Sequence, residues 1–245
     1  MRKHLLWLTV LLVSICNFAR AEELPVATLL HALPASGAAL QTAPTSHDLL
    51  RTTPLTDGAE TFWREKIYTI LRRHYHQTAE EPTYLRRDIA QMAEYFARYT
   101  DVRDLFRDLD GGRWQWQYGQ QQAETQVLGT RLQVRSVTVY FDSRAGAQFQ
   151  FRDACATKVP YCFTAPADVF LHELLHVRAI LVNPDRFIAQ GGMAEHLYPH
   201  AHEQQTIAAE RQLYAAMSRQ DAIPRPIRSS HTGRHTRTHC VTCLQ

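Results

Sequence analysis

The spacing of apolar residues along this chain changes from helical to alternating and back again. Apolar side chains recur every three or four positions over residues 67–75 and 85–96, which is the period of an amphipathic α-helix. A shorter run with this period covers residues 101–109, and Gly111 and Gly112 follow it, as glycine often follows the last turn of a helix. The pattern predicts three helices in the first part of the folded region.

The apolar period then shortens to two, which is the period of a half-buried strand. Alternating apolar residues occupy residues 114–118, 132–134, 137–141 and 149–151. The phase of the alternation slips at Arg135-Ser136, which predicts a β-bulge or a local twist. These residues predict one small, mainly antiparallel sheet.

Two more helices are predicted after the sheet. Thr164 can cap a helix, Pro166 suits a first turn, and Asn183-Pro184 ends the run. A further apolar-periodic run covers residues 207–217. Helices, a small sheet and two later helices predict an α+β fold, and residues 59–231 are enough to bury one core as a single domain.

The first of these later helices carries the motif His172-Glu173-Leu174-Leu175-His176. Residues four apart lie one turn above each other on a helix, so both imidazoles can bind one cation. Glu173 can take a proton from a water molecule on that cation and deliver it to a leaving amine. The motif predicts a zinc site with His172 and His176 as ligands and Glu173 as general base. The plainer interpretation is an amphipathic helix with two solvated histidines.

Residues 169–177 resemble the active-site helix of the zincin metallopeptidases. The metzincin branch of that family is excluded, because its longer motif needs glycine at Ala179 and histidine at Val182. The resemblance therefore implies a gluzincin-like protein with a zincin-like fold and one Zn²⁺ per chain. It also implies that a carboxylate on a later helix is the third ligand.

Glu203 and Glu210 are the carboxylates that can supply this ligand. They are seven residues apart, so they face the same way on a helix. We expect Glu203, at the start of the helix, to bind the metal and Glu210 to orient another ligand. Both could instead be solvated helix charges, and further ligand candidates lie nearby: Glu195, His196, His200 and His202.

The segment after the last helix carries a second resemblance. Residues 223–231 are similar to the end of the short NleD-like effector zinc proteases of bacterial pathogens. In those proteases, and in clostridial neurotoxin light chains, an Arg-x-x-Tyr element faces the zinc. The resemblance covers about residues 100–231 and implies that Arg228 and His231 form this element here. The two side chains would then stabilise the oxyanion of a tetrahedral intermediate.

Residues 1–21 have the pattern of a secretory signal peptide. A basic start precedes an apolar run over residues 5–16, and Ala19-Arg20-Ala21 is a cleavage signal. The apolar run is too short to span a membrane. We expect a periplasmic or secreted protein that begins at Glu22, and lipidation at Cys16 is the alternative.

Removal of this leader leaves a chain without net charge. The sequence has 27 lysine and arginine residues against 24 aspartate and glutamate residues, and Arg2, Lys3 and Arg20 lie in the leader. A chain without net charge has no overall field to attract nucleic acid or an anionic membrane. The expected partner is a protein or peptide substrate, with no nucleic acid and no membrane span after cleavage.

Four cysteines lie beyond the leader, and export favours disulfides between them. We expect Cys155 to pair with Cys162, because a short loop brings their two ends together. The tail over residues 232–245 is either a second metal site or a flexible cationic segment in which Cys240 and Cys243 are oxidised. The second interpretation is preferred, because zinc-finger spacing needs another matching pair of ligands.

Four segments are therefore predicted: a signal peptide over 1–21, a partly disordered tether or pro-segment over 22–58, a zincin domain over 59–231 and the tail. The predicted function is an exported zinc metalloendopeptidase that hydrolyses peptide bonds. Two alternatives stay open. One is a toxin-like effector protease with a single protein target, and the other is a non-catalytic periplasmic protein for metal binding or interaction.

Overall fold

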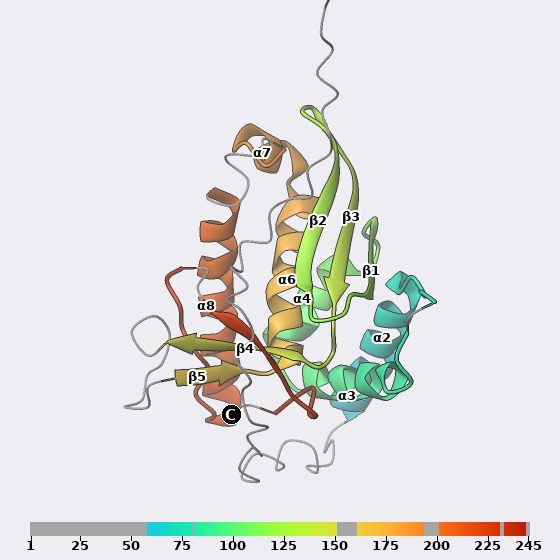
Figure 1. Ribbon diagram of the computed structural model, residues 1–245, viewed down its shortest axis with the longest axis vertical. Coiled ribbons are helices and arrows are strands. Elements are labelled where there is room, and N and C mark those ends of the chain that lie inside the picture. Colours follow the sequence, from blue (N-terminus) through green and yellow to red (C-terminus); the bar gives the residue numbers. More distant parts are fainter. Residues whose placement is uncertain (1–57, 80, 151–160, 194–200, 231–232, 244–245) are drawn as a thin grey trace, which may run out of the picture. The chain divides into compact units, whose positions relative to one another are not determined.

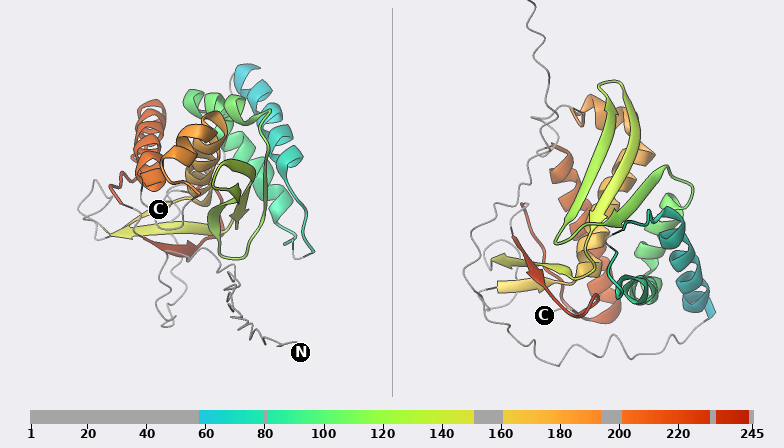
Figure 2. Two further views of the ribbon diagram at one scale, coloured as in Figure 1. Left: turned by 90° about the horizontal axis from the view of Figure 1, so that it is seen from above. Right: turned by 45° about the vertical axis from the view of Figure 1, so that its right-hand side comes forward.

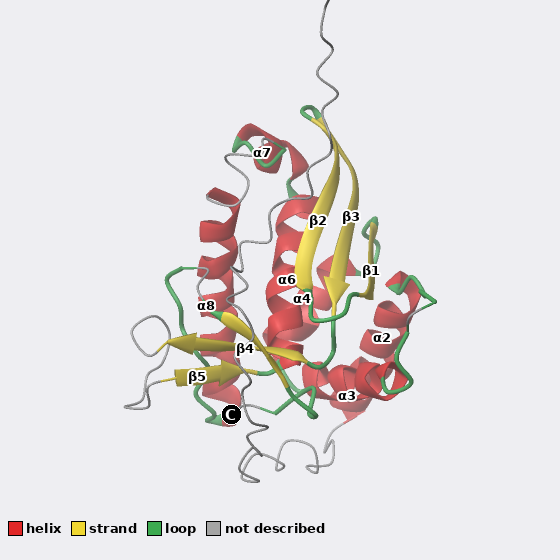
Figure 3. Cartoon of the chain, viewed as in Figure 1, coloured by secondary structure: helices red, strands yellow, loops and turns green. Residues whose placement is uncertain are grey.

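The computed structural model describes residues 58–79, 81–150, 161–193, 201–230 and 233–243. This part of the chain has an α+β fold, in which helices pack beside two small sheets (Figures 1 and 3). Within these residues no helix is long and apolar enough to cross a membrane.

Three helices come first in the described part of the chain, as the apolar periodicity predicts. They are α2 (Gly58–His74), α3 (Leu85–Ala97) and α4 (Thr100–Leu109). Most of their apolar side chains are buried in one core that also includes side chains of the first sheet and of the motif helix. Trp116 fixes the sheet to these helices, since its indole Nε1 donates to the carbonyl oxygen of Leu71 at 2.8 Å.

The first sheet has three strands in the order β1-β3-β2. β3 (Gln133–Phe141) pairs in parallel with β1 (Trp114–Tyr118) and antiparallel with β2 (Ala123–Thr130). Leu132, which the alternation assigned to a strand, lies instead in the exposed turn between β2 and β3. β2 is an edge strand of this sheet and packs against the motif helix.

A β-bulge interrupts the pairing of β2 with β3. Leu128 pairs with Ser136, and the next residue, Gly129, pairs with Val134, so Arg135 is the extra residue. The bulge predicted at Arg135-Ser136 is confirmed.

The second sheet is antiparallel and has the order β5-β4-β6. Its strands are β4 (Ala145–Gln150), β5 (Tyr161–Thr164) and β6 (Arg234–Arg237). The prediction of a single sheet is wrong, because the chain turns at Asp142 before β4 begins. The carbonyl oxygen of Asp142 accepts a hydrogen bond from the Ala145 backbone at 2.9 Å, and its carboxylate accepts one from the Arg144 backbone at 2.9 Å.

After β5, the described residues form three further helices: α6 (Pro166–Val182), α7 (Pro184–Ala189) and α8 (Glu203–Asp221). α6 begins with proline in its first turn, as predicted, but its N-cap is Ala165 rather than Thr164. Asn183 ends α6, and its side chain accepts a hydrogen bond from the backbone of Arg186 in α7. α6 and α8 pack side by side (Figures 1 and 2).

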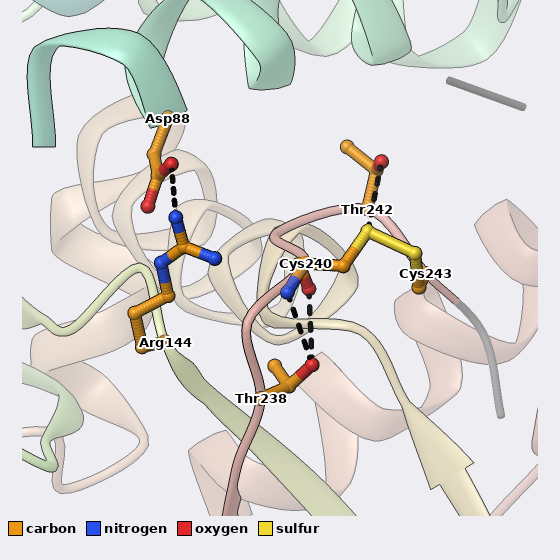
Figure 4. Close-up of a disulfide and its surroundings, with 6 residues drawn as sticks. All are labelled: Asp88, Arg144, Thr238, Cys240, Thr242 and Cys243. Carbon is orange, nitrogen blue, oxygen red and sulfur yellow. Dashed lines mark hydrogen bonds and ion pairs between the residues drawn. A yellow bond between two sulfur atoms is a disulfide. The ribbon is translucent and has the colours of Figure 1, made fainter. Parts of the chain in front are cut away.

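The described part of the tail belongs to the folded structure. Cys240 and Cys243 form the expected disulfide, and Thr238 Oγ1 accepts a hydrogen bond from the Cys240 backbone at 3.2 Å (Figure 4). Val241 is buried, and its carbonyl oxygen accepts a hydrogen bond from the Ala167 backbone, in the first turn of α6, at 2.8 Å. The tail expected to be flexible is therefore a strand and a disulfide-closed turn against the start of α6.

Some predictions concern residues outside the described ranges. These are the leader over 1–21, residues 22–57 of the tether predicted over 22–58, and the pairing of Cys155 with Cys162. Cys162 is disulfide-bonded, but Cys155 is not among the described residues, so this pairing stays a prediction.

Candidate metal centre

α6 directs three ionisable side chains into the interior. His172, Glu173 and His176 expose only 2%, 4% and 5% of their surface. Burial of such groups is costly unless each has a polar partner. The partners of these three residues therefore define the site.

Glu203, the first residue of α8, completes a triangle of ligand atoms. The Nε2 atoms of His172 and His176 are 3.1 Å apart, and the Glu203 oxygens lie 3.2 Å and 3.1 Å from them. Two ligand atoms bound tetrahedrally to one zinc ion are about 3.3 Å apart, so the triangle has the dimensions of a zinc site. The three residues form a group that can hold a metal ion. The Glu203 side chain is 16% exposed, more than the side chains of the two histidines.

Both histidines turn Nε2 toward the triangle because Nδ1 has a partner. His172 Nδ1 lies 2.5 Å from a carboxylate oxygen of Glu210. His176 Nδ1 lies 3.1 Å from Thr206 Oγ1, and the Thr206 hydroxyl donates its proton to the His202 carbonyl at 3.1 Å. The Thr206 hydroxyl has already donated and can only accept, and the Glu210 carboxylate is nearer to His172 Nδ1 than the donor Arg228 Nη2 is, so both Nδ1 atoms carry the hydrogen. The lone pair of each Nε2 then points at the place of a metal.

Arg228 lies behind Glu210. Its Nε and Nη2 donate to the two Glu210 oxygens at 3.0 Å and 2.7 Å, and Nη2 is 2.9 Å from His172 Nδ1. Burial would raise the pKa of Glu210, but the charges of Arg228 and His172 lower it to about 2. The resemblance places Arg228 in front of the metal, whereas its contacts are at the ring nitrogen that does not face the triangle.

The carboxylates give the site a negative potential. Burial and the Arg228 charge lower the pKa of His172, but Glu210 and Glu203 outweigh them and raise it to about 9. Burial raises the pKa of Glu203, yet His176 and His172 hold it well below its usual range. The same charges that favour a proton on His172 favour a cation between the three ligand atoms.

Glu173 is held by an element other than its own helix. The hydroxyl of Thr125, in β2, donates to Glu173 Oε2 at 2.7 Å. β6 brings His235 into the same region. Burial lowers the pKa of His235, and the Glu173 carboxylate acts in the opposite direction. His235 Nδ1 is buried and has no hydrogen-bond partner among the described residues.

The structure brings the predicted base and the three predicted ligands together, but it does not describe every candidate. Four candidates lie outside the described residues: Glu195, His196, His200 and His231. Thr206 was not predicted, although it lies three residues after Glu203 and four before Glu210, on the same helix face. Thr125 has no such signal, because β2 was not predicted.

Comparison with known proteins adds no relative to this picture. No family model, no curated protein and no solved structure matches the chain. The structure itself supports a buried group of two histidines and one glutamate that can hold a metal ion. The zincin resemblance rests on residues 169–177 and on the geometry of that group.

Proposed function

We propose that the protein is a zinc-dependent peptidase whose general base is Glu173. The observation that carries this proposal is the triangle of His172, His176 and Glu203, with Glu173 next in sequence to the first ligand. Two histidines and a carboxylate are a known ligand set of catalytic zinc in peptidases. Three protein ligands leave one coordination position for water or substrate.

The chain's own groups divide the work of such a reaction. Zinc, when bound, would acidify a water molecule and polarise the substrate carbonyl. Glu173 would accept a proton at a carboxylate oxygen and deliver it to the leaving amine. Glu210 and Arg228 hold the His172 ring in place. The Glu210–Arg228 pair is neutral, so Glu173 and Glu203 together offset the charge of a divalent cation.

Glu173→Gln tests the role of the base. An amide keeps the shape of the side chain but cannot accept the proton. We expect one zinc per chain by mass spectrometry of the metal content, and a loss of peptide hydrolysis of about hundredfold to ten-thousandfold. Glu65→Gln, on the exposed face of α2, is the matched control. Unchanged hydrolysis by Glu173→Gln would remove Glu173 from the mechanism.

The ligand set is tested separately from turnover. The double variant His172→Ala/His176→Ala and the single variant Glu203→Ala should lose stoichiometric zinc, because each removes ligand atoms. Zinc retained by the double variant would overturn the site. Stoichiometric zinc on a wild-type protein that hydrolyses no peptide would favour the non-catalytic metal-binding alternative.

We also propose that the protein acts outside the cytoplasm. The leader pattern of residues 1–21 supports export, and disulfides such as Cys240–Cys243 persist in oxidising compartments. Sequencing of the amino terminus of protein from the periplasm or the medium should find Glu22. A lipidated Cys16 would instead show a membrane-anchored protein.

A further inference from the structure

Thr125 is a side chain of the first sheet that contacts the motif helix at Glu173. It is buried, with 7% of its surface exposed, although it lies on an edge strand. Its Oγ1 is 2.7 Å from Glu173 Oε2 and 3.2 Å from the Glu173 carbonyl oxygen. A hydroxyl has one proton, and a carboxylate is the stronger and here the nearer acceptor. The Thr125 hydroxyl therefore donates its hydrogen bond to the Glu173 carboxylate.

The donor is fixed more firmly than the group it holds. Thr125 pairs with Val139 in a continuous stretch of the β2–β3 ladder, so its backbone position is set by the sheet. A β-branched side chain also has little freedom about its first torsion. Glu173, by contrast, has a long side chain whose rotamers cost free energy to restrict. The contact therefore orients the carboxylate from a rigid element.

We propose that Thr125 is a positioning residue for the general base: it holds Oε2 of Glu173 and so directs Oε1 to the proton that is transferred. This inference rests on the proposed function, in which Glu173 is the base. Its consequence is kinetic, because an oriented carboxylate matters most when the proton moves. Loss of the hydroxyl should then affect turnover more than substrate binding.

Thr125→Val removes the hydroxyl and keeps the shape and the strand preference of the side chain. We expect a kcat about tenfold or more below that of the wild type, a KM within about twofold and one zinc per chain. Thr125→Ser restores the donor and should recover most of the lost kcat. The control is Thr138→Val in β3, which removes a buried hydroxyl that accepts from Gln115 and does not contact the site.

A second measurement does not depend on activity. The shift in the urea midpoint of unfolding caused by Thr125→Val should be at least halved in a Glu173→Ala background, because the hydrogen bond is then already lost. Equal shifts in the two backgrounds, or a kcat that Thr125→Val leaves unchanged in an active enzyme, would overturn the inference and leave the proposed function standing. A zinc-loaded wild type without hydrolytic activity would overturn both.

Discussion

Each histidine of the candidate metal centre depends on a residue that is not itself a ligand. Glu210 accepts from His172, and Thr206 accepts from His176. Such partners select the ring tautomer and restrict the rotation of the imidazole, which typically changes metal affinity by ten- to a hundredfold. The metal affinity of the site therefore depends on residues of α8 as much as on the histidines of α6.

Two different roles can be assigned to Arg228. Its contacts with Glu210 and His172 indicate support of a ligand, whereas the resemblance implies stabilisation of an oxyanion. We expect Arg228→Gln to weaken zinc binding about tenfold or more in a chelator competition, because Glu210 loses its countercharge. The control is Arg211→Gln, on the exposed face of α8. Unchanged affinity with reduced turnover would support the oxyanion role instead.

Spacing in the sequence is enough to find site residues on one helix face, but it does not find the residues of other helices and strands that contact them. The positions of His172, Glu173 and His176 follow from the helical period alone. The choice between Glu203 and Glu210 depends on where α8 begins relative to α6, which no local pattern contains. Thr125 could not be found at all, since its importance depends on a contact between a strand and a helix.

At the scale of elements, α8 has a second polar anchor at its carboxyl-terminal end. Asp221 accepts from Arg225 Nη2 at 2.8 Å and from the hydroxyl of Tyr99 at 2.8 Å. Arg225 Nη2 also donates to the hydroxyls of Tyr95 and Tyr99 at 2.9 Å. The end of α8 is thus bound to Tyr99, at the start of α4, and through Arg225 to Tyr95 in α3, while its first residue, Glu203, belongs to the candidate metal centre.

This anchor predicts a pH-dependent stability. Burial raises the pKa of Asp221, but hydrogen bonds from Arg225 and the Ile223 backbone outweigh it and lower the pKa below 3.8. A lowered pKa contributes stability above the unfolded value of about 4, and that contribution is lost as the pH falls through the folded value. Asp221→Asn should therefore be less stable than the wild type at pH 7, by about 1–2 kcal/mol.

Urea unfolding at pH 7, 5 and 3 measures this difference. The gap between wild type and Asp221→Asn should be similar at pH 7 and 5 and should shrink at pH 3. Asp185→Asn, at an exposed position in the first turn of α7, is the control. A gap of constant size at all three pH values would mean that the carboxylate charge contributes nothing.

Apolar periodicity predicts the elements that bury one face and misses those that do not. Apolar residues recur with a helical period in α2 and α3 and alternate in β3, and even the bulge at Arg135 is visible as a change in the phase of the alternation. β2 buries little besides Thr125, and all four residues of β6 are polar. Both strands are stabilised by backbone pairing with a neighbour. Such pairing leaves no hydrophobic signal in the sequence.

At the scale of the whole molecule, the last described residues support the start of the motif helix. Val241 accepts a backbone hydrogen bond from Ala167, and the disulfide between Cys240 and Cys243 closes the turn around it. The first turn of a helix has backbone donors without partners in the helix itself. The turn therefore supplies α6 with an acceptor that its N-cap, Ala165, does not provide.

Removal of this disulfide should lower the stability of the protein. For so short a loop, the chain-entropy model gives about 2 kcal/mol. The double variant Cys240→Ser/Cys243→Ser should show this loss in urea unfolding. Reduction of the wild type should give a loss of the same direction, although it also reduces the disulfide of Cys162. An unfolding midpoint unaffected by the double variant would show that the turn holds without its cross-link.

The residues of the candidate metal centre are far apart in the sequence, so they are synthesised at different times. A ribosome releases the two histidines and Glu173 first, then Glu203 and Glu210, and lastly β6 and the turn that braces α6. Until Glu203 emerges, a nascent chain offers only two of the three ligands of the candidate metal centre. If the leader acts as proposed and the chain crosses the membrane before it folds, the candidate centre assembles outside the cytoplasm.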